Sequence, residues 1–260
     1  MWWDRSEPLE IHLSDRAVGF GPSSVQPGQW VETSGLDDSL RQVAARLSLN
    51  ASLDVCRIRV WLGTGLAQPY LVPSASGVRN KHEARALAVT MASDATAIEG
   101  DVRIWIDRWR AGEATLAVAM PAHVWQGLQD VVTSQAAARD RAPRMSKVRR
   151  VAIVSIRPWW NLPFDELLAD SRRDARRTGW SLSDGANTLH GVIDRGAVLE
   201  IGCDRPGPHD PTGDLLRRRL QVTWGAATQA RHLFFERQAS GTEARALPLG
   251  AWCQAAGDVA

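Results

Sequence analysis

Two segments with the same pattern, one in each half of the chain, constrain the fold most strongly. Trp180–Ile201 alternates apolar and polar residues between glycine turns, which predicts two β-strands. Asp184-Gly185 stands near its start and is followed by Thr188. A similar pattern opens the chain at Leu9–Phe20, where Ser14-Asp15-Arg16 separates two short strands. A strand–turn–strand pattern in each half indicates a duplicated skeleton.

The overall composition is that of a folded protein with a sizeable core. The chain has 260 residues, of which 44% are hydrophobic and 23% charged. Its net charge of +2 implies no polyanionic partner, and few aromatic residues stand beside the arginine clusters, so nucleic acid is not expected. The three cysteines form no CxxC pair, and the six histidines form no metal-binding motif. We therefore expect a reducing compartment and no metal site.

Helices and strands are expected to alternate along the whole chain. Helices are predicted at 39–47, 82–91, after Pro121, around 164–168 and at 215–229. Further strands are predicted at 55–62, 102–106, 115–120 and 232–237, and 66–72 is either a short helix or extended. Arg150–Ile156 is a nearly continuous apolar run, which predicts a strand buried on both faces. The pattern favours a mixed α/β fold with layered sheets.

The predicted organisation is two halves with a connector. Residues 1–133 form the first half, and the basic, weakly patterned residues 134–149 form the connector. Residues 150–237 form the second half, and residues 238–260 form a small polar tail. The first residues lack the apolar core of a signal peptide, and no run reaches the roughly 18–20 apolar residues that span a bilayer. A cytoplasmic protein is expected.

Four stretches carry a resemblance to a known superfamily; they are 10–20, 118–121 with the helix after it, 151–160 and 182–189. Their order resembles that of the actin-like ATPase superfamily, whose fold is a duplicated ribonuclease-H-like unit of mixed sheets flanked by helices. Within it, the chain looks most similar to cytoplasmic assembly proteins of bacterial type II secretion and type IV pilus systems, namely the secretion L protein's cytoplasmic domain and the pilus M protein.

The resemblance implies two phosphate loops; the first departs from the superfamily pattern, and the second is the better match. The cofactor-binding candidates are Asp15 in the first loop and Asp184, Gly185 and Thr188 in the second. Asp15 is followed by Arg16 where the pattern has a glycine. Since glycine turns present the amides that cradle phosphates, binding of ATP and Mg²⁺ is doubtful and no catalytic residue is assigned. Alternatively, Asp15 and Asp184-Gly185 are ordinary turn residues.

Pro158-Trp159-Trp160 is the predicted interface. Neighbouring residues on a strand or helix point in different directions, so one indole of the pair is expected to face outward as an anchor for a partner. The alternative is that both indoles pack into the core from two sides.

The resemblance implies a cytoplasmic scaffold at the inner-membrane face that couples a membrane platform to an assembly ATPase, without its own ATP hydrolysis. The expected partners are the inner-membrane platform subunit and the assembly ATPase, membrane association occurs only through partners, and a homodimer is an open alternative. A second hypothesis is an ATP-dependent enzyme, an ATPase or phosphotransferase, of the same superfamily. A third is an α/β interaction module outside it.

Overall fold

The computed structural model describes residues 8–21, 29–49, 55–106, 109–140, 150–173, 177–183, 187–205, 214–224 and 229–234. These residues form two compact units. The first unit contains the described residues up to Leu66 and His123–Trp159, and the second contains Ala67–Ala122 and those described from Trp160 onward. The predicted tail, 238–260, lies outside the described residues.

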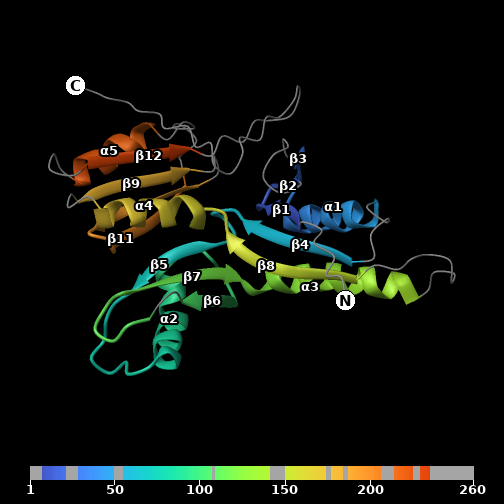
Figure 1. Ribbon diagram of the computed structural model, residues 1–260, viewed down its shortest axis with the longest axis horizontal. Coiled ribbons are helices and arrows are strands. Elements are labelled where there is room, and N and C mark those ends of the chain that lie inside the picture. Colours follow the sequence, from blue (N-terminus) through green and yellow to red (C-terminus); the bar gives the residue numbers. More distant parts are fainter. Residues whose placement is uncertain are drawn as a thin grey trace. The chain divides into compact units, whose positions relative to one another are not determined.

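The first unit is built on a five-stranded sheet in the order β3-β2-β1-β4-β8. Its elements are β1 (Leu9–Leu13), β2 (Ala17–Gly21), β3 (Gln29–Glu32), α1 (Leu36–Leu49), β4 (Val55–Leu62), α3 (Ala122–Asp140) and β8 (Arg150–Pro158). The pairs β1–β2 and β2–β3 are antiparallel, whereas β1–β4 and β4–β8 are parallel. In Figure 1, β8 (yellow) runs beside β4 (cyan) although the two are far apart in the sequence.

The two faces of this sheet differ in chemistry. One face is apolar and buried, and its side chains include Ile11, Leu13, Phe20, Val60 and Leu62. Helix α1 covers it, since the guanidinium of Arg46 lies 5.8 Å from the centre of the Phe20 ring. Strand alternation directs another set of side chains to the opposite face; this set includes Glu10, His12, Trp30, Arg57, Arg59 and Trp61.

Strand β8 differs from its prediction in two ways. The apolar run predicts burial on both faces within the second half, but β8 is the outermost strand of the first sheet in the described part of the chain. Ala152 and Val154 are exposed, Val154 by 42%. The first sheet thus continues to Pro158 rather than ending before residue 150, and α3 occupies 134–140 of the predicted connector.

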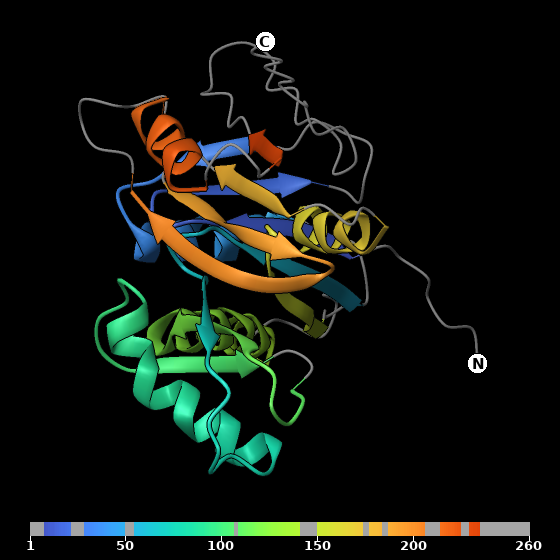
Figure 2. The same cartoon turned by 90° about the vertical axis from the view of Figure 1, so that its left-hand side faces the viewer.

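Between β4 and α3 the chain forms a small α/β insert, which belongs to the second unit. It contains β5 (Gln68–Val72), α2 (Lys81–Ala95), β6 (Val102–Ile106) and β7 (Thr115–Pro121). The strands are antiparallel in the order β5-β7-β6, which confirms the predicted hairpin and makes 68–72 extended. Alanines on α2 face the sheet, and the hydroxyl of Tyr70 donates to the carbonyl of Ala88 at 2.7 Å. Figure 2 shows α2 crossing the insert strands.

Local sequence explains where α2 begins and ends. The side chain of Asn80 accepts hydrogen bonds from the amides of His82 and Glu83, and the carboxylate of Glu83 accepts one from the amide of Arg79 at 2.7 Å. The two bonds to Asn80 satisfy amides that the first helical turn leaves without partners, and the bond to Arg79 fixes the residue before the cap. At the other end, the amide and hydroxyl of Thr96 both donate to the carbonyl of Ala92.

The second unit also carries a four-stranded sheet in the order β11-β10-β9-β12. Its elements are α4 (Asn161–Arg173), β9 (Thr178–Ser183), β10 (Thr188–Asp194), β11 (Ala197–Asp204), α5 (Asp214–Trp224) and β12 (Gln229–Phe234). The segment predicted as two strands, 180–201, therefore belongs to three. Arg195 and Gly196 have φ of 48° and 77° and form the tight turn between β10 and β11. The helix predicted to reach residue 229 ends at Trp224.

Helices α4 and α5 cover opposite faces of this sheet (Figure 2). Phe164 of α4 packs against Trp180, with ring centres 5.2 Å apart. Trp224 of α5 lies over Gly179, where an added Cβ would come within 2.4 Å of the indole. Since residues 179 and 180 are neighbours on one strand, they point to opposite faces.

The two sheets repeat one order of elements. In each, three antiparallel strands are followed by a helix and a fourth strand that pairs in parallel with the first. The β1–β2 turn of the first sheet thus corresponds to the β9–β10 connection of the second. In the described part of the chain, no helix combines the length and apolarity needed to cross a bilayer.

Candidate functional site

The first predicted loop is the turn between β1 and β2, and it is closed by hydrogen bonds of its own. The amide and hydroxyl of Ser14 both donate to the carbonyl of Ala17, at 2.9 and 3.1 Å. Asp15 is half-buried and Arg16 is exposed at the tip. The carbonyl of Arg16 accepts from the amide of Thr33 at 2.9 Å, which ties the turn to the residue after β3.

Polar side chains gather around this turn at the ends of β1 and β4. The hydroxyls of Thr33 and Ser39 lie 2.7 Å apart, and Ser39 and Thr64 are fully buried. The amide of Gly63 donates to the carbonyl of Leu13 at 2.8 Å, joining the ends of the two parallel strands. Ligands of open α/β sheets bind at the carboxyl ends of parallel strands, so this edge is the candidate site of the first unit.

Helix α1 begins at the same edge, but its first turn is acidic. It carries Asp37 and Asp38, and the carboxylate of Asp38 accepts from the amide of Ser34 at 3.1 Å. A helix N-terminus attracts anions through its free amides and its dipole. Here two carboxylates already supply negative charge, which disfavours a phosphate at this helix end.

In the second predicted loop, the structure describes Thr188, whereas Asp184 and Gly185 lie outside the described residues. Thr188 is the first residue of β10, is 4% exposed, and stands in register with Ser183 and Asp204. Asp15 and Thr188 belong to different units. Each of the two residues therefore belongs to the sheet of its own unit.

A histidine–carboxylate pair lies on the same sheet face as Thr188. His190 Nε2 is 3.2 Å from Asp204 Oδ2. Burial lowers the pKa of His190, an effect that the carboxylates of Asp204 and Glu200 partly oppose. The ring lies over Gly202, where an added Cβ would come within 2.7 Å of Cε1. The spacing of His190 from Thr188 points to this shared face, but no sequence signal links either residue to Asp204.

The tryptophans of the predicted interface are buried. Trp159 and Trp160 are 4% and 0% exposed, and Pro158 is buried as well. Trp160 Nε1 donates to the carbonyl of Ala67 at 3.1 Å, and its ring meets Phe164 edge-on at 5.7 Å. The expectation that one indole faces outward is wrong, because the chain turns here from β8 into α4 and both rings pack inward.

A buried carboxylate in the first sheet was not singled out from the sequence. Glu10 is 4% exposed and accepts hydrogen bonds from Arg59 Nη1, at 2.8 Å, and from the indole N–H of Trp61. On the same face, His12 stacks on Trp61 at 6.4 Å between ring centres and contacts Trp30 at 5.7 Å. Burial lowers the pKa of His12 to about 4. A glutamate between apolar strand residues is the signal that could have revealed this cluster.

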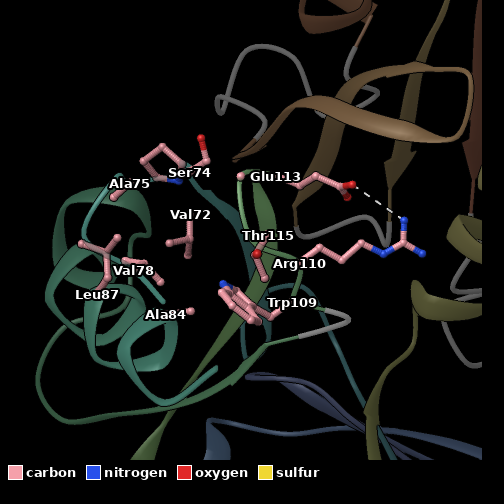
Figure 3. Close-up of a pocket in the computed structure, with 12 residues that line it drawn as sticks. Val72, Ser74, Ala75, Val78, Ala84, Leu87, Trp109, Arg110, Glu113 and Thr115 are labelled. Atoms are coloured by element: carbon pink, nitrogen blue, oxygen red, sulfur yellow. Dashed lines mark ion pairs between the residues drawn. The ribbon is translucent and has the colours of Figure 1, made fainter. Parts of the chain in front are cut away.

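The insert has a small hollow on its surface (Figure 3). Val72, Ala84, Leu87 and Thr115 line it, together with Trp109 and the ion-paired Arg110 and Glu113. The closest atoms of Arg110 and Glu113 in this pair lie 3.8 Å apart. Apolar and polar side chains both line the hollow, and an aromatic ring and an ion pair stand among them.

Solved structures identify the architecture. A Bacteroides thetaiotaomicron protein, described as having an actin-like ATPase fold and unknown function, superposes with a TM-score of 0.56 over 92% of this chain and 87% of its own, at 10% identity. This chain has the actin-like ATPase fold. No protein-family model matches the sequence, and a search of curated proteins gives no match.

Two further solved structures are similar at lower TM-scores. The cytoplasmic domain of EpsL, an inner-membrane component of the type II secretion system of Vibrio cholerae, has a TM-score of 0.45 and 12% identity, over 91% of this chain and 86% of its own. The PilM–PilN type IV pilus biogenesis complex has a TM-score of 0.47 and 11% identity, over 85% of this chain and 68% of the matched chain. In this chain the β1–β2 turn and the β9–β10 connection are the two loop positions that the sequence predicts for phosphates.

Proposed function

We propose that this chain is a cytoplasmic actin-like scaffold of a bacterial type II secretion or type IV pilus assembly machine. It would couple an inner-membrane platform to a cytoplasmic ATPase and would not hydrolyse ATP itself. The observation that carries the nucleotide-independent part of the proposal is the closed β1–β2 turn, in which the amide of Ser14 is bonded to the carbonyl of Ala17.

Phosphate binding by a loop needs backbone amides that point at the ligand. At the β1–β2 turn the Ser14 amide is already bonded, and the exposed tip residue is Arg16. The nearby first turn of α1 carries Asp37 and Asp38, whose charges repel a phosphate. In the second unit, the hydroxyl-bearing Thr188 is buried. These features support a nucleotide-independent role.

Surfaces outside the two loops support recognition of other proteins. The insert adds its own sheet and helix to the duplicated core, and its hollow combines Trp109 with the charged pair Arg110–Glu113. Aromatic and arginine residues are enriched where proteins bind one another. The assignment to secretion or pilus systems rests on the four sequence stretches that resemble those proteins.

The biochemical test is calorimetry of Mg²⁺–ATP binding to the purified chain, with Asp184→Ala as the control variant. We expect no binding up to millimolar nucleotide. Micromolar binding, about 8 kcal/mol, that disappears in the variant would contradict the proposal and support the ATP-dependent enzyme instead.

The genetic test asks whether the chain is needed for assembly and whether its loops matter. Deletion of the gene in its host should abolish secretion or piliation, measured by export of a secreted enzyme or by counting pili. A doubly substituted chain, Asp15→Ala with Asp184→Ala, should restore assembly because nucleotide chemistry is not required. Normal secretion and piliation in the deletion strain would contradict the proposed scaffold function.

A further inference from the structure

Strand β8 presents an open backbone edge with apolar side chains. It pairs with β4 on one side, and in the described part of the chain no strand pairs with its other side. Its residues Val151, Ile153 and Ile156 are half-buried and Val154 is 42% exposed. An edge of this kind can accept an added strand from another polypeptide through its free amides and carbonyls.

Two exposed arginines mark the ends of this edge. Arg57 of β4 stands in register with Ala152, and Arg157 of β8 stands in register with Trp61. Arg57 and Trp61 are four residues apart on one strand, so Arg57 and Arg157 lie on the same sheet face. Within the described residues neither forms an ion pair, whereas Arg59 between them is paired with Glu10. The edge therefore carries two uncompensated positive charges around an apolar middle.

We infer that β8 is a docking edge for an extended segment of a partner protein with an apolar middle and acidic ends. The segment would lengthen the first sheet by pairing with β8. Its carboxylates would meet Arg57 at one end and Arg157 at the other, and its central side chains would cover Val154. Backbone pairing supplies affinity in such additions, and the flanking charges select the partner and its register.

The sequence of β8 argues against a second copy of this chain as the occupant. A second copy would offer β8 itself, which contains no acidic residue from end to end. It therefore supplies none of the carboxylates that Arg57 and Arg157 favour. The β4–β8 ladder shifts register at Val154, so a strand added to β8 cannot pair regularly along its whole length. The charges at the two ends of the added strand therefore matter more for its register.

This inference deepens the scaffold function and rests on it for the partner's role, but the surface itself is independent of nucleotide. The test uses fluorescence anisotropy with a labelled, capped peptide that has an alternating Val–Thr core between acidic ends. A peptide with the same core between lysine ends is the comparison. The acidic peptide should bind the whole chain, and the lysine peptide should bind at least about tenfold more weakly.

The decisive measurement repeats this binding experiment with charge-reversed variants of the protein. Arg157→Glu and Arg57→Glu should each weaken the acidic peptide about tenfold, and the double variant should prefer the lysine peptide. Arg41→Glu is the matched control, since Arg41 is an exposed arginine on α1 of the same unit, with 75% of its side chain exposed. Circular dichroism checks that each variant folds, and Arg57→Glu carries the test if Arg157→Glu does not fold.

Several results would overturn the inference. They are absence of binding, equal binding of the two peptides, and acidic-peptide binding that survives both arginine substitutions. Sedimentation that reveals a dimer dissociated by Val154→Lys would assign the edge to a second copy and also overturn it. None of these results alters the calorimetry with ATP, so failure of the docking edge and failure of the scaffold function are distinguishable.

Discussion

The indole N–H of Trp61 donates to the carboxylate of Glu10 within the first sheet, and Arg59 binds the other oxygen of the same carboxylate. Both donors come from β4, and the acceptor comes from β1. The polar cluster thus joins two parallel strands whose other face is entirely apolar around Ile11 and Val60.

Glu10→Ala should lower the free energy of unfolding by about 2–3 kcal/mol, because it leaves a buried indole N–H and a partly buried guanidinium without their acceptor. Urea denaturation followed by tryptophan fluorescence measures the change. Glu113→Ala is the control, since its ion pair with Arg110 is exposed and should contribute less than about 1 kcal/mol. Equal losses in the two variants would contradict the prediction.

His12 should make stability depend on pH. Burial lowers its folded-state pKa from 6.5 to about 4, so the unfolded chain binds a proton more readily than the folded one. The stabilisation by neutral His12 is complete above pH 6.5 and is lost as the pH falls towards 4. Each tenfold difference in proton affinity between the folded and unfolded chain corresponds to about 1.4 kcal/mol in the free energy of unfolding.

The measurement for His12 is the free energy of unfolding between pH 7 and 4 in the wild type and in His12→Gln. The variant should lose part of the wild-type slope in this range. His82→Gln, at the exposed start of α2, is the matched control for the removal of a histidine. An NMR titration in which His12 protonates at its ordinary pKa would refute the prediction.

Gly191→Ala should destabilise the second unit by about 1–3 kcal/mol or prevent its folding. An added Cβ would stand 2.1 Å from the backbone oxygen of Glu200 and 3.0 Å from the Trp180 ring, and neither neighbour can move freely inside the sheet. Gly77→Ala is the control, because nothing lies within 4 Å of its added Cβ. Thermal melts that show the same change in both variants would contradict this account.

Trp160→Ala should cost about 3–5 kcal/mol, because it empties a fully buried site and removes the hydrogen bond to Ala67. Trp105→Ala, at a side chain that is 38% exposed, should cost far less. Chemical denaturation of both variants measures the difference. If Trp160→Ala folds with wild-type stability, the ring does not contribute to the core as the structure indicates.

The local patterns of the sequence predict most elements but not their long-range pairing. The hairpins β1–β2 and β6–β7 and the helix of α2 follow from alternation, turn residues and capping within short segments. The apolar run of β8 has the same composition whether the strand is central or at an edge, so only its pairing with β4 reveals which it is. Long-range pairing leaves no local signal.

The candidate loops show a similar division between local and distant information. Asp15 is recognisable as a turn residue, but the bonds of the turn to Thr33 and the acidic start of α1 depend on how three elements meet. For Trp159 and Trp160, alternation along a strand predicts side chains that point in opposite directions. The two residues instead lie in the turn between β8 and α4, and both rings are buried. The pairing of His190 with Asp204 depends on β10 and β11 being adjacent.

The repeated order of three strands, a helix and a parallel strand has an evolutionary consequence. In both repeats the turn after the first strand lies outside the ladder that holds the sheet together. Substitutions there need not disturb the paired strands, so the residues of either turn can change while the sheet is kept. The repeated topology can therefore outlast the amino-acid identities of its loops.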